Sequence, residues 1–173
     1  MSVLEKFKSI RTFVFDVDGV MTDGSVQIFE TGEQVRRMST RDGYSLQLAI
    51  KKGYRIVVIS GALSEGVRQR LHYLGVRDIF LDIHDKVAVL RQYAKDHSLE
   101  INDMLYMGDD IPDYLPMQFV GLACAPADAA PEIRHIAAYI SSFNGGQGCV
   151  RDVIEKVLKL NGQWELNTTV ASK

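Results

Sequence analysis

The sequence feature that most constrains the fold is an apolar run at residues 12–15 that ends abruptly in two aspartates, Asp16 and Asp18. A short run rich in aromatic and β-branched residues predicts a buried strand, and strand side chains alternate, so both carboxylates can face the same way near its end. Gly19 then lets the backbone turn. Two carboxylates this close repel each other unless a cation lies between them or one keeps its proton. The pair therefore indicates a metal site, an acid/base pair or both, and the alternative is an Asp-rich turn that caps a helix.

Length and composition limit the class of protein. The chain has 173 residues, 46% of them hydrophobic and 24% charged, which predicts one globular domain over residues 1–173. A formal net charge of -2 gives no reason to expect a nucleic-acid or membrane partner. Cys124 and Cys149 are the only cysteines, too few for a disulfide framework or an all-cysteine zinc site, so any metal should be held by oxygen. Because no signal-peptide core or membrane-length apolar segment is present, we expect a cytoplasmic enzyme.

Short apolar runs alternate with amphipathic segments along the chain, a pattern typical of a parallel sheet with crossover helices. We therefore predict an α/β fold of Rossmann-like type, a parallel sheet flanked by helices. The expected strands are residues 12–15, 55–59, 79–83, 104–107, 120–123 and 138–140, and the expected helices are residues 42–52, 64–74, 87–97 and 150–160.

Two segments depart from this alternation. Residues 25–30 and 34–39 flank a turn and predict a β-hairpin inserted at about residues 24–39. An isolated hairpin is only marginally stable, so this one should lean on the body or on another subunit. The tail from about residue 165 is polar and is expected to be loosely held unless a neighbour orders it.

Four polar residues share a position, the C-terminal end of an expected strand or just beyond it: Asp16, Ser60, Lys86 and Asp109. In an open parallel sheet these ends lie along one edge, where ligands bind, so we expect one pocket. Each residue alone has a simpler interpretation. Asp109, Asp110 and Asp113 could cap a helix, the serine could lie in an ordinary turn, and the lysine could be a solvated surface charge. The combination is more specific than any member.

These segments resemble a known family. The stretch DVDGVMTDG, Ser60, Lys86 and GDDIPD at residues 108–113 are similar to the four motifs of haloacid dehalogenase (HAD) superfamily phosphatases, in their usual order and spacing. Only the hairpin fits after the first motif, so there is no cap domain. The chain resembles the small capless branch of 3-deoxy-D-manno-octulosonate 8-phosphate phosphatases, including RDGYSL at 41–46, DK at 85–86 and GGQGCVRDVIEKVL at 145–158.

The resemblance implies a two-step phosphoryl transfer. Asp16 would attack phosphorus to form an aspartyl phosphate, and Asp18 would act as the general acid and then the general base. Mg²⁺ would be held by Asp16, the backbone carbonyl of Asp18, and Asp109, while Asp110 or Asp113 would orient that shell. The phosphoryl oxygens would be held by Ser60, the backbone N–H of Gly61, and Lys86.

The resemblance also implies a homotetramer assembled through the hairpin, with a neighbouring subunit covering each pocket, and a role in lipopolysaccharide sugar biosynthesis. The candidates for binding a sugar-acid carboxylate are Thr40, Arg41, Arg68 and Arg70. For Arg68 and Arg70, a place on a solvated helix face is the favoured interpretation. The phosphate of a nine-carbon sugar acid is an alternative substrate, although the uncharged Ala62 weakly favours the eight-carbon acid. A non-catalytic oligomerisation module is the alternative of another class.

Overall fold

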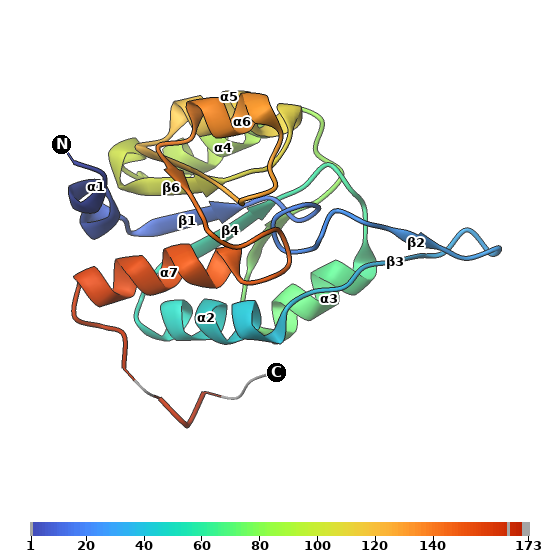
Figure 1. Ribbon diagram of the computed structural model, residues 1–173, viewed down its shortest axis with the longest axis horizontal. Helices are drawn as coiled ribbons and strands as arrows, with labels where there is room; N and C mark the ends of the chain where they lie inside the picture. The colour runs from blue at the N-terminus through green and yellow to red at the C-terminus, as the bar shows by residue number, and fades with distance from the viewer. Residues whose placement is uncertain (1, 166, 171–173) are drawn as a thin grey trace.

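The computed structural model describes residues 2–165 and 167–170 and has a single six-stranded sheet at its centre (Figure 1). The strand order is β5-β4-β1-β6-β7-β8, and all neighbouring pairs are parallel. The strands are β1 (Thr12–Phe15), β4 (Arg55–Ile59), β5 (Asp78–Phe80), β6 (Met104–Met107), β7 (Leu122–Ala125) and β8 (Tyr139–Ile140). The predicted parallel sheet with flanking helices is confirmed.

Helices cover both faces of the sheet (Figure 1). One face is covered by α1 (Val3–Ser9), α2 (Thr40–Lys51), α3 (Glu65–Tyr73) and α7 (Cys149–Leu160), and the other by α4 (Lys86–Asp96), α5 (Tyr114–Phe119) and α6 (Pro131–Ile136). In β1, Phe13 and Phe15 pack into the first of these cores and Val14 into the second. Because both faces are covered, residues 13–15 of this strand are all apolar and show no alternation in sequence.

The structure corrects several predicted boundaries. The third strand ends at Phe80 rather than at residue 83, and the fifth is shifted to Leu122–Ala125. Three short helices, α1, α5 and α6, were not predicted, because six or seven residues are too few to show a helical period. Two single 3₁₀ turns, Ile101–Asp103 and Ile111–Asp113, flank β6.

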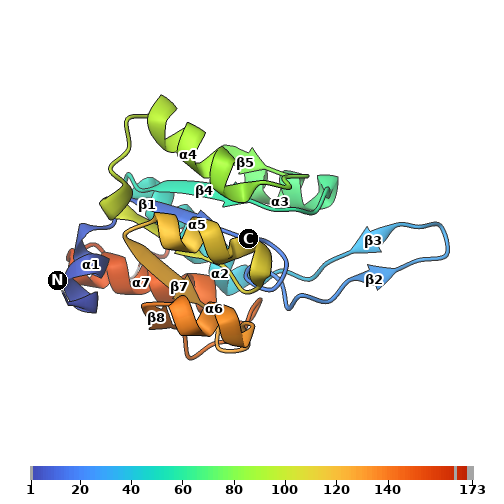
Figure 2. The same ribbon diagram turned by 90° about the horizontal axis from the view of Figure 1, so that it is seen from above.

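The inserted hairpin projects away from the body (Figure 2). Its strands β2 (Gln27–Ile28) and β3 (Gln34–Val35) are antiparallel, shorter than predicted, and exposed. The tail predicted from about residue 165 lies partly outside the described residues, at 166 and 171–173. In its described part, the Asn167 carbonyl accepts a hydrogen bond from the Tyr44 hydroxyl. Every helix in the described ranges is too short or too polar to cross a membrane.

Candidate active site

The four residues predicted at the strand ends lie around one cavity of about 400 Å³. Asp16 directly follows β1, Ser60 directly follows β4, and Asp109 lies two residues after β6. Since β1 lies between β4 and β6, the strand order places these three side by side. Lys86 reaches the cavity as the first residue of α4. Other lining residues are Asp18, Gly24, Gly61, Ala62, Ile83, His84, Asp110 and Pro112.

A buried lysine joins two of the carboxylates. Lys86 is only 5% exposed, and its Nζ lies 2.9 Å from Asp16 Oδ2 and 2.8 Å from Asp113 Oδ1. The start of a helix disfavours a cation, so the two carboxylates must compensate for both the helix dipole and the lost hydration. The interpretation of Lys86 as a solvated surface charge is therefore wrong.

Asp113 is the structural centre of this cluster. Its Oδ1 also accepts a hydrogen bond from the Tyr106 hydroxyl at 2.7 Å, and its Oδ2 accepts one from the Asp109 backbone N–H at 3.1 Å. Asp113 is fully buried, and its carboxylate holds both the Lys86 ammonium group and the backbone at the start of the loop that carries Asp109. Asp110 has a different place, because its exposed side chain accepts from the Ile111 backbone N–H and caps the following turn.

The cluster carries more negative than positive charge. Burial, followed by repulsion from Asp113, raises the pKa of Asp16 to about 7, against the opposing effect of Lys86. The same two causes, burial and then Asp113, raise the pKa of Asp109 to about 8. Burial lowers the pKa of Lys86, but Asp113 and Asp16 outweigh it and the pKa rises. A bound cation would relieve this repulsion.

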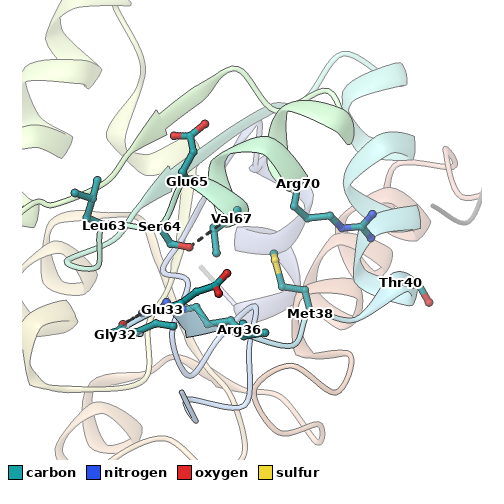
Figure 3. A pocket seen from close by; sticks show the side chains of 13 residues that line it. Gly32, Glu33, Arg36, Met38, Thr40, Leu63, Ser64, Glu65, Val67 and Arg70 are labelled. Atoms are coloured by element: carbon teal, nitrogen blue, oxygen red, sulfur yellow. Dashed lines mark hydrogen bonds between the residues drawn. The ribbon is translucent and has the colours of Figure 1, made fainter. Parts of the chain in front are cut away.

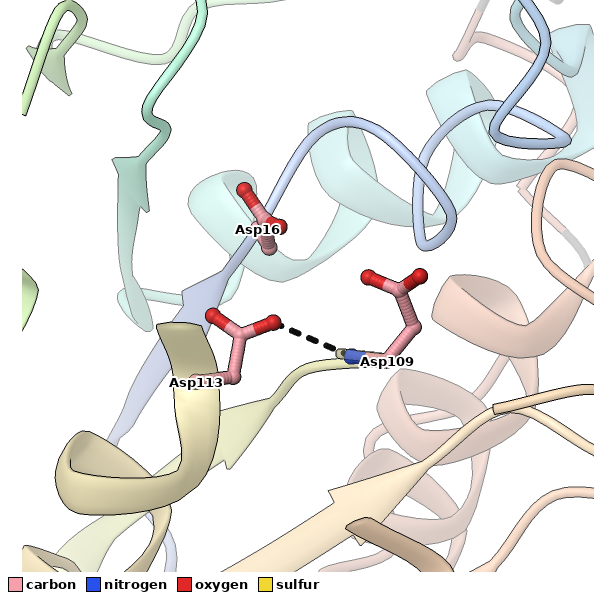
Figure 4. A group of neighbouring side chains, drawn as sticks. All are labelled: Asp16, Asp109 and Asp113. Carbon is pink, nitrogen blue, oxygen red and sulfur yellow. Dashed lines mark hydrogen bonds between the residues drawn. The ribbon is translucent and has the colours of Figure 1, made fainter. Parts of the chain in front are cut away.

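The donor set fits a divalent cation with a preference for oxygen. Carboxylate oxygens of Asp16, Asp109 and Asp113 lie within 4.8 Å of one another (Figure 4). Asp109 Oδ1 is buried and has no hydrogen-bond partner in the described part of the chain. Oxygen ligands suit Mg²⁺, so these residues match the metal that the sequence predicts. Gly19 leaves room for the group, since a Cβ there would lie 1.9 Å from Asp109 Oδ2.

The second aspartate of the first motif has a partner that sequence reasoning missed. Arg36, just beyond β3, donates to Asp18 Oδ1 from Nε at 2.7 Å and to Asp18 Oδ2 from Nη2 at 3.2 Å. The pair is separated by 18 residues and joins the hairpin to the first motif. No local spacing marks such a contact, because it depends on how the hairpin leaves the sheet.

Comparison with known proteins identifies the family. The chain is 30% identical over 161 residues to the 3-deoxy-D-manno-octulosonate 8-phosphate phosphatase KdsC of Escherichia coli strain K12, covering 93% of this chain and 86% of that protein. The chain belongs to this phosphatase family of the HAD superfamily. No protein-family model matches it.

Solved structures of related phosphatases share the fold. The crystal structure of the Yersinia pestis 3-deoxy-D-manno-octulosonate 8-phosphate phosphatase is 30% identical with a TM-score of 0.91, and the match covers 93% of this chain and 87% of that one. The Moraxella catarrhalis phosphatase, solved with magnesium ion, phosphate ion and a KDO molecule, is 30% identical with a TM-score of 0.88, covering 91% and 90%.

In this phosphatase a glycine-rich segment supports the first motif. Added Cβ atoms would lie 2.0 Å from the Gly19 carbonyl oxygen at Gly145 and 2.6 Å from the Thr22 carbonyl carbon at Gly146. The Gly146 backbone N–H donates to the Val20 carbonyl at 2.9 Å. The segment therefore packs backbone against backbone on the loop that carries Asp18 and Gly19.

Three of the four predicted carboxylate-binding residues of the phosphatase line two cavities that share Thr40. Thr40 and Arg70 line a groove of about 800 Å³ between β3 and α3 (Figure 3). Thr40 also lines a second cavity of about 430 Å³ at the start of α2, together with Arg41. Arg68 instead pairs with Glu65 on its own helix, with Nε and Oε2 3.5 Å apart.

Proposed function

We propose that this phosphatase hydrolyses 3-deoxy-D-manno-octulosonate 8-phosphate through an aspartyl-phosphate intermediate, with Mg²⁺ as cofactor. The observation that carries the proposal is the placement of Asp16, a buried carboxylate at the end of the central strand, 2.9 Å from Lys86 and within 4.8 Å of two further carboxylates. The family relationship supplies the sugar acid as the substrate class.

In the first step an oxygen of Asp16 forms a bond to phosphorus, and the bond between phosphorus and the sugar oxygen breaks. Asp18 gives a proton to that oxygen as it leaves. In the second step Asp18 takes a proton from a water molecule, whose oxygen attacks phosphorus and releases inorganic phosphate. Asp16 is thereby restored. Arg36 holds both oxygens of Asp18, which keeps this carboxylate in a fixed orientation beside the nucleophile.

The phosphoryl oxygens are held at the ends of the neighbouring strands. Lys86 supplies the charge, and the Ser60 hydroxyl and Gly61 backbone N–H supply neutral donors from the tip of β4. Ser60 is buried and accepts a hydrogen bond from the Ala62 backbone N–H at 3.2 Å, so its own hydrogen remains free to be donated.

Asp16, Asp109 and the Asp18 carbonyl would hold Mg²⁺. Asp113 would fix the position of Asp109 by accepting the hydrogen bond from its backbone N–H. A bound Mg²⁺ would polarise the phosphoryl group and offset its charge in the transition state. The orphaned oxygen of Asp109 and the raised pKa values of Asp16 and Asp109 support this assignment.

We further propose a cytoplasmic homotetramer that acts in lipopolysaccharide sugar biosynthesis. The hairpin exposes apolar side chains, with Ile28 70%, Phe29 45% and Val35 40% exposed, as expected of a surface that packs against another subunit. A neighbouring subunit in the tetramer would cover the catalytic pocket of this chain, which no cap domain covers.

Phosphate release from a panel of sugar phosphates, with Mg²⁺ and with a chelator, tests the proposal. We expect release from the eight-carbon acid phosphate to exceed that from the nine-carbon one, and to stop with the chelator. Asp16→Asn should keep the fold but show no Mg²⁺-dependent phosphate release. Substantial turnover by that variant, or a wild-type enzyme silent on the whole panel, would refute the assignment.

A further inference from the structure

The hairpin contributes one buried cation to the site. Arg36 is the first residue beyond β3, and its side chain is only 5% exposed although the residues of both hairpin strands are exposed. Burial of a guanidinium is costly unless its N–H groups are paired. Two of its nitrogens face Asp18, and Nη2 also lies 3.5 Å from Gln34 Oε1. Within the described residues, Nη1 has no hydrogen-bond partner.

The arginine lies where the catalytic cavity meets the groove between β3 and α3. Ala62 lines the catalytic cavity, while the next residue, Leu63, lines the groove. On the hairpin side, Asp18 lines the cavity and its partner Arg36 lines the groove. A leaving group whose oxygen lies beside Asp18 therefore has the groove as a continuation of its site. Figure 3 shows the groove with Arg36 and Arg70 among its walls.

The charged residues that line the groove are two arginines, Arg36 and Arg70, and two glutamates, Glu33 and Glu65. Of its two glutamates, Glu65 is engaged by Arg68, and Glu33 lies on the exposed hairpin turn. A guanidinium has two edges that can each hold a carboxylate. Asp18 occupies the edge formed by Nε and Nη2, which leaves the donors of Nη1 for a ligand.

We propose that Arg36 binds the carboxylate of the sugar acid while it remains bonded to Asp18, an inference that rests on the proposed function. One guanidinium then recognises the acid group of the leaving group and positions the residue that protonates it. Selectivity for an acidic sugar is thus built into this chain's own hairpin, in addition to any contact from a neighbouring subunit.

A matched pair of substrates tests this role. The probes are 3-deoxy-D-manno-octulosonate 8-phosphate and the same compound with its carboxylate converted to the neutral amide. Because Arg36 also contacts Asp18, its substitution should slow both, so the informative quantity is the ratio of the two kcat/KM values. We expect the wild type to prefer the acid by roughly 10- to 100-fold, the range of one charge-assisted hydrogen bond.

In Arg36→Met the ratio should fall close to one, and Arg36→Lys, which keeps the charge but loses the second edge, should be intermediate. Arg37→Met, a change to the exposed neighbouring arginine, is the control and should keep the wild-type ratio. Thermal unfolding of each variant checks the fold. A ratio unchanged in Arg36→Met, with both rates reduced equally, would show that the residue serves Asp18 alone and would overturn the proposal.

Calorimetric binding separates this inference from the proposed function. The probes here are the dephosphorylated sugar acid and its amide, which need no turnover. If the wild type hydrolyses neither phosphate but binds the acid more tightly than Arg36→Met does, the reaction assignment fails and the carboxylate site stands. Equal binding of the acid by both proteins would refute the site.

Discussion

Stability should depend on pH through a buried aspartate outside the catalytic cavity, Asp42. It lies in the first turn of α2, is 4% exposed, and accepts a hydrogen bond on Oδ1 from the Arg151 backbone N–H at 2.8 Å. Helix α7 begins after Gly148, which has no side chain to cap it, so Asp42 caps α7 from a neighbouring helix. Among described residues, Asp42 Oδ2 has no partner, and burial raises the pKa from 3.8 to about 6.

The direction in which the free energy of unfolding changes with pH follows from the direction of that pKa shift. A carboxyl whose pKa is higher in the folded state than in the unfolded chain favours folding while it is protonated. Its contribution is complete below pH 4 and is lost as the pH rises through about 6. Two pKa units correspond to about 3 kcal/mol of unfolding free energy. Ionised Asp42 therefore destabilises the protein at neutral pH despite its capping hydrogen bond.

Asp42→Asn removes the ionisation and keeps an acceptor for the Arg151 N–H. Urea unfolding followed by circular dichroism, from pH 4 to pH 8, should show the variant gaining about 3 kcal/mol relative to the wild type between pH 4 and pH 7. Asp42→Ala should show the same pH-dependent gain but lower stability than Asp42→Asn throughout, because it also loses the cap. Parallel curves for Asp42→Asn and the wild type would refute the reasoning.

Three further substitutions test the site. Gly19→Ala should abolish phosphate release and also lower Tm, because its Cβ would meet the Asp109 carboxylate and a backbone φ of +84° is strained for alanine; normal turnover would contradict this. Lys86→Met should cost about 3–5 kcal/mol in urea unfolding, since it leaves buried carboxylates unpaired; an unchanged midpoint would argue against it. Gly145→Ala should lower kcat more than it raises KM, because its Cβ would collide with backbone at Gly19, which cannot yield without moving the first motif.

Much of the architecture could be predicted from local patterns. Strands β1, β4 and β6 lie where their apolar runs predicted them, because a strand buried on both faces needs a continuous apolar run. The position of Asp16 at the end of such a run, with polar residues at the ends of the neighbouring strands, was enough to predict one pocket. Parallel topology brings those ends to a common edge whatever the details of packing.

Sequence alone thus determined which strands form and which chemistry gathers at their ends. Only the tertiary structure decided the partners: Asp113 for Lys86, Arg36 for Asp18, and Asp42 for the start of α7. These contacts join residues 18 to 109 positions apart. Which residues meet depends on the angle of the hairpin and on the packing of α2 against α7. Local sequence propensity predicts neither of these. The two aspartates of the first motif, equivalent in sequence, differ because one is buried against a lysine and the other is held by the hairpin.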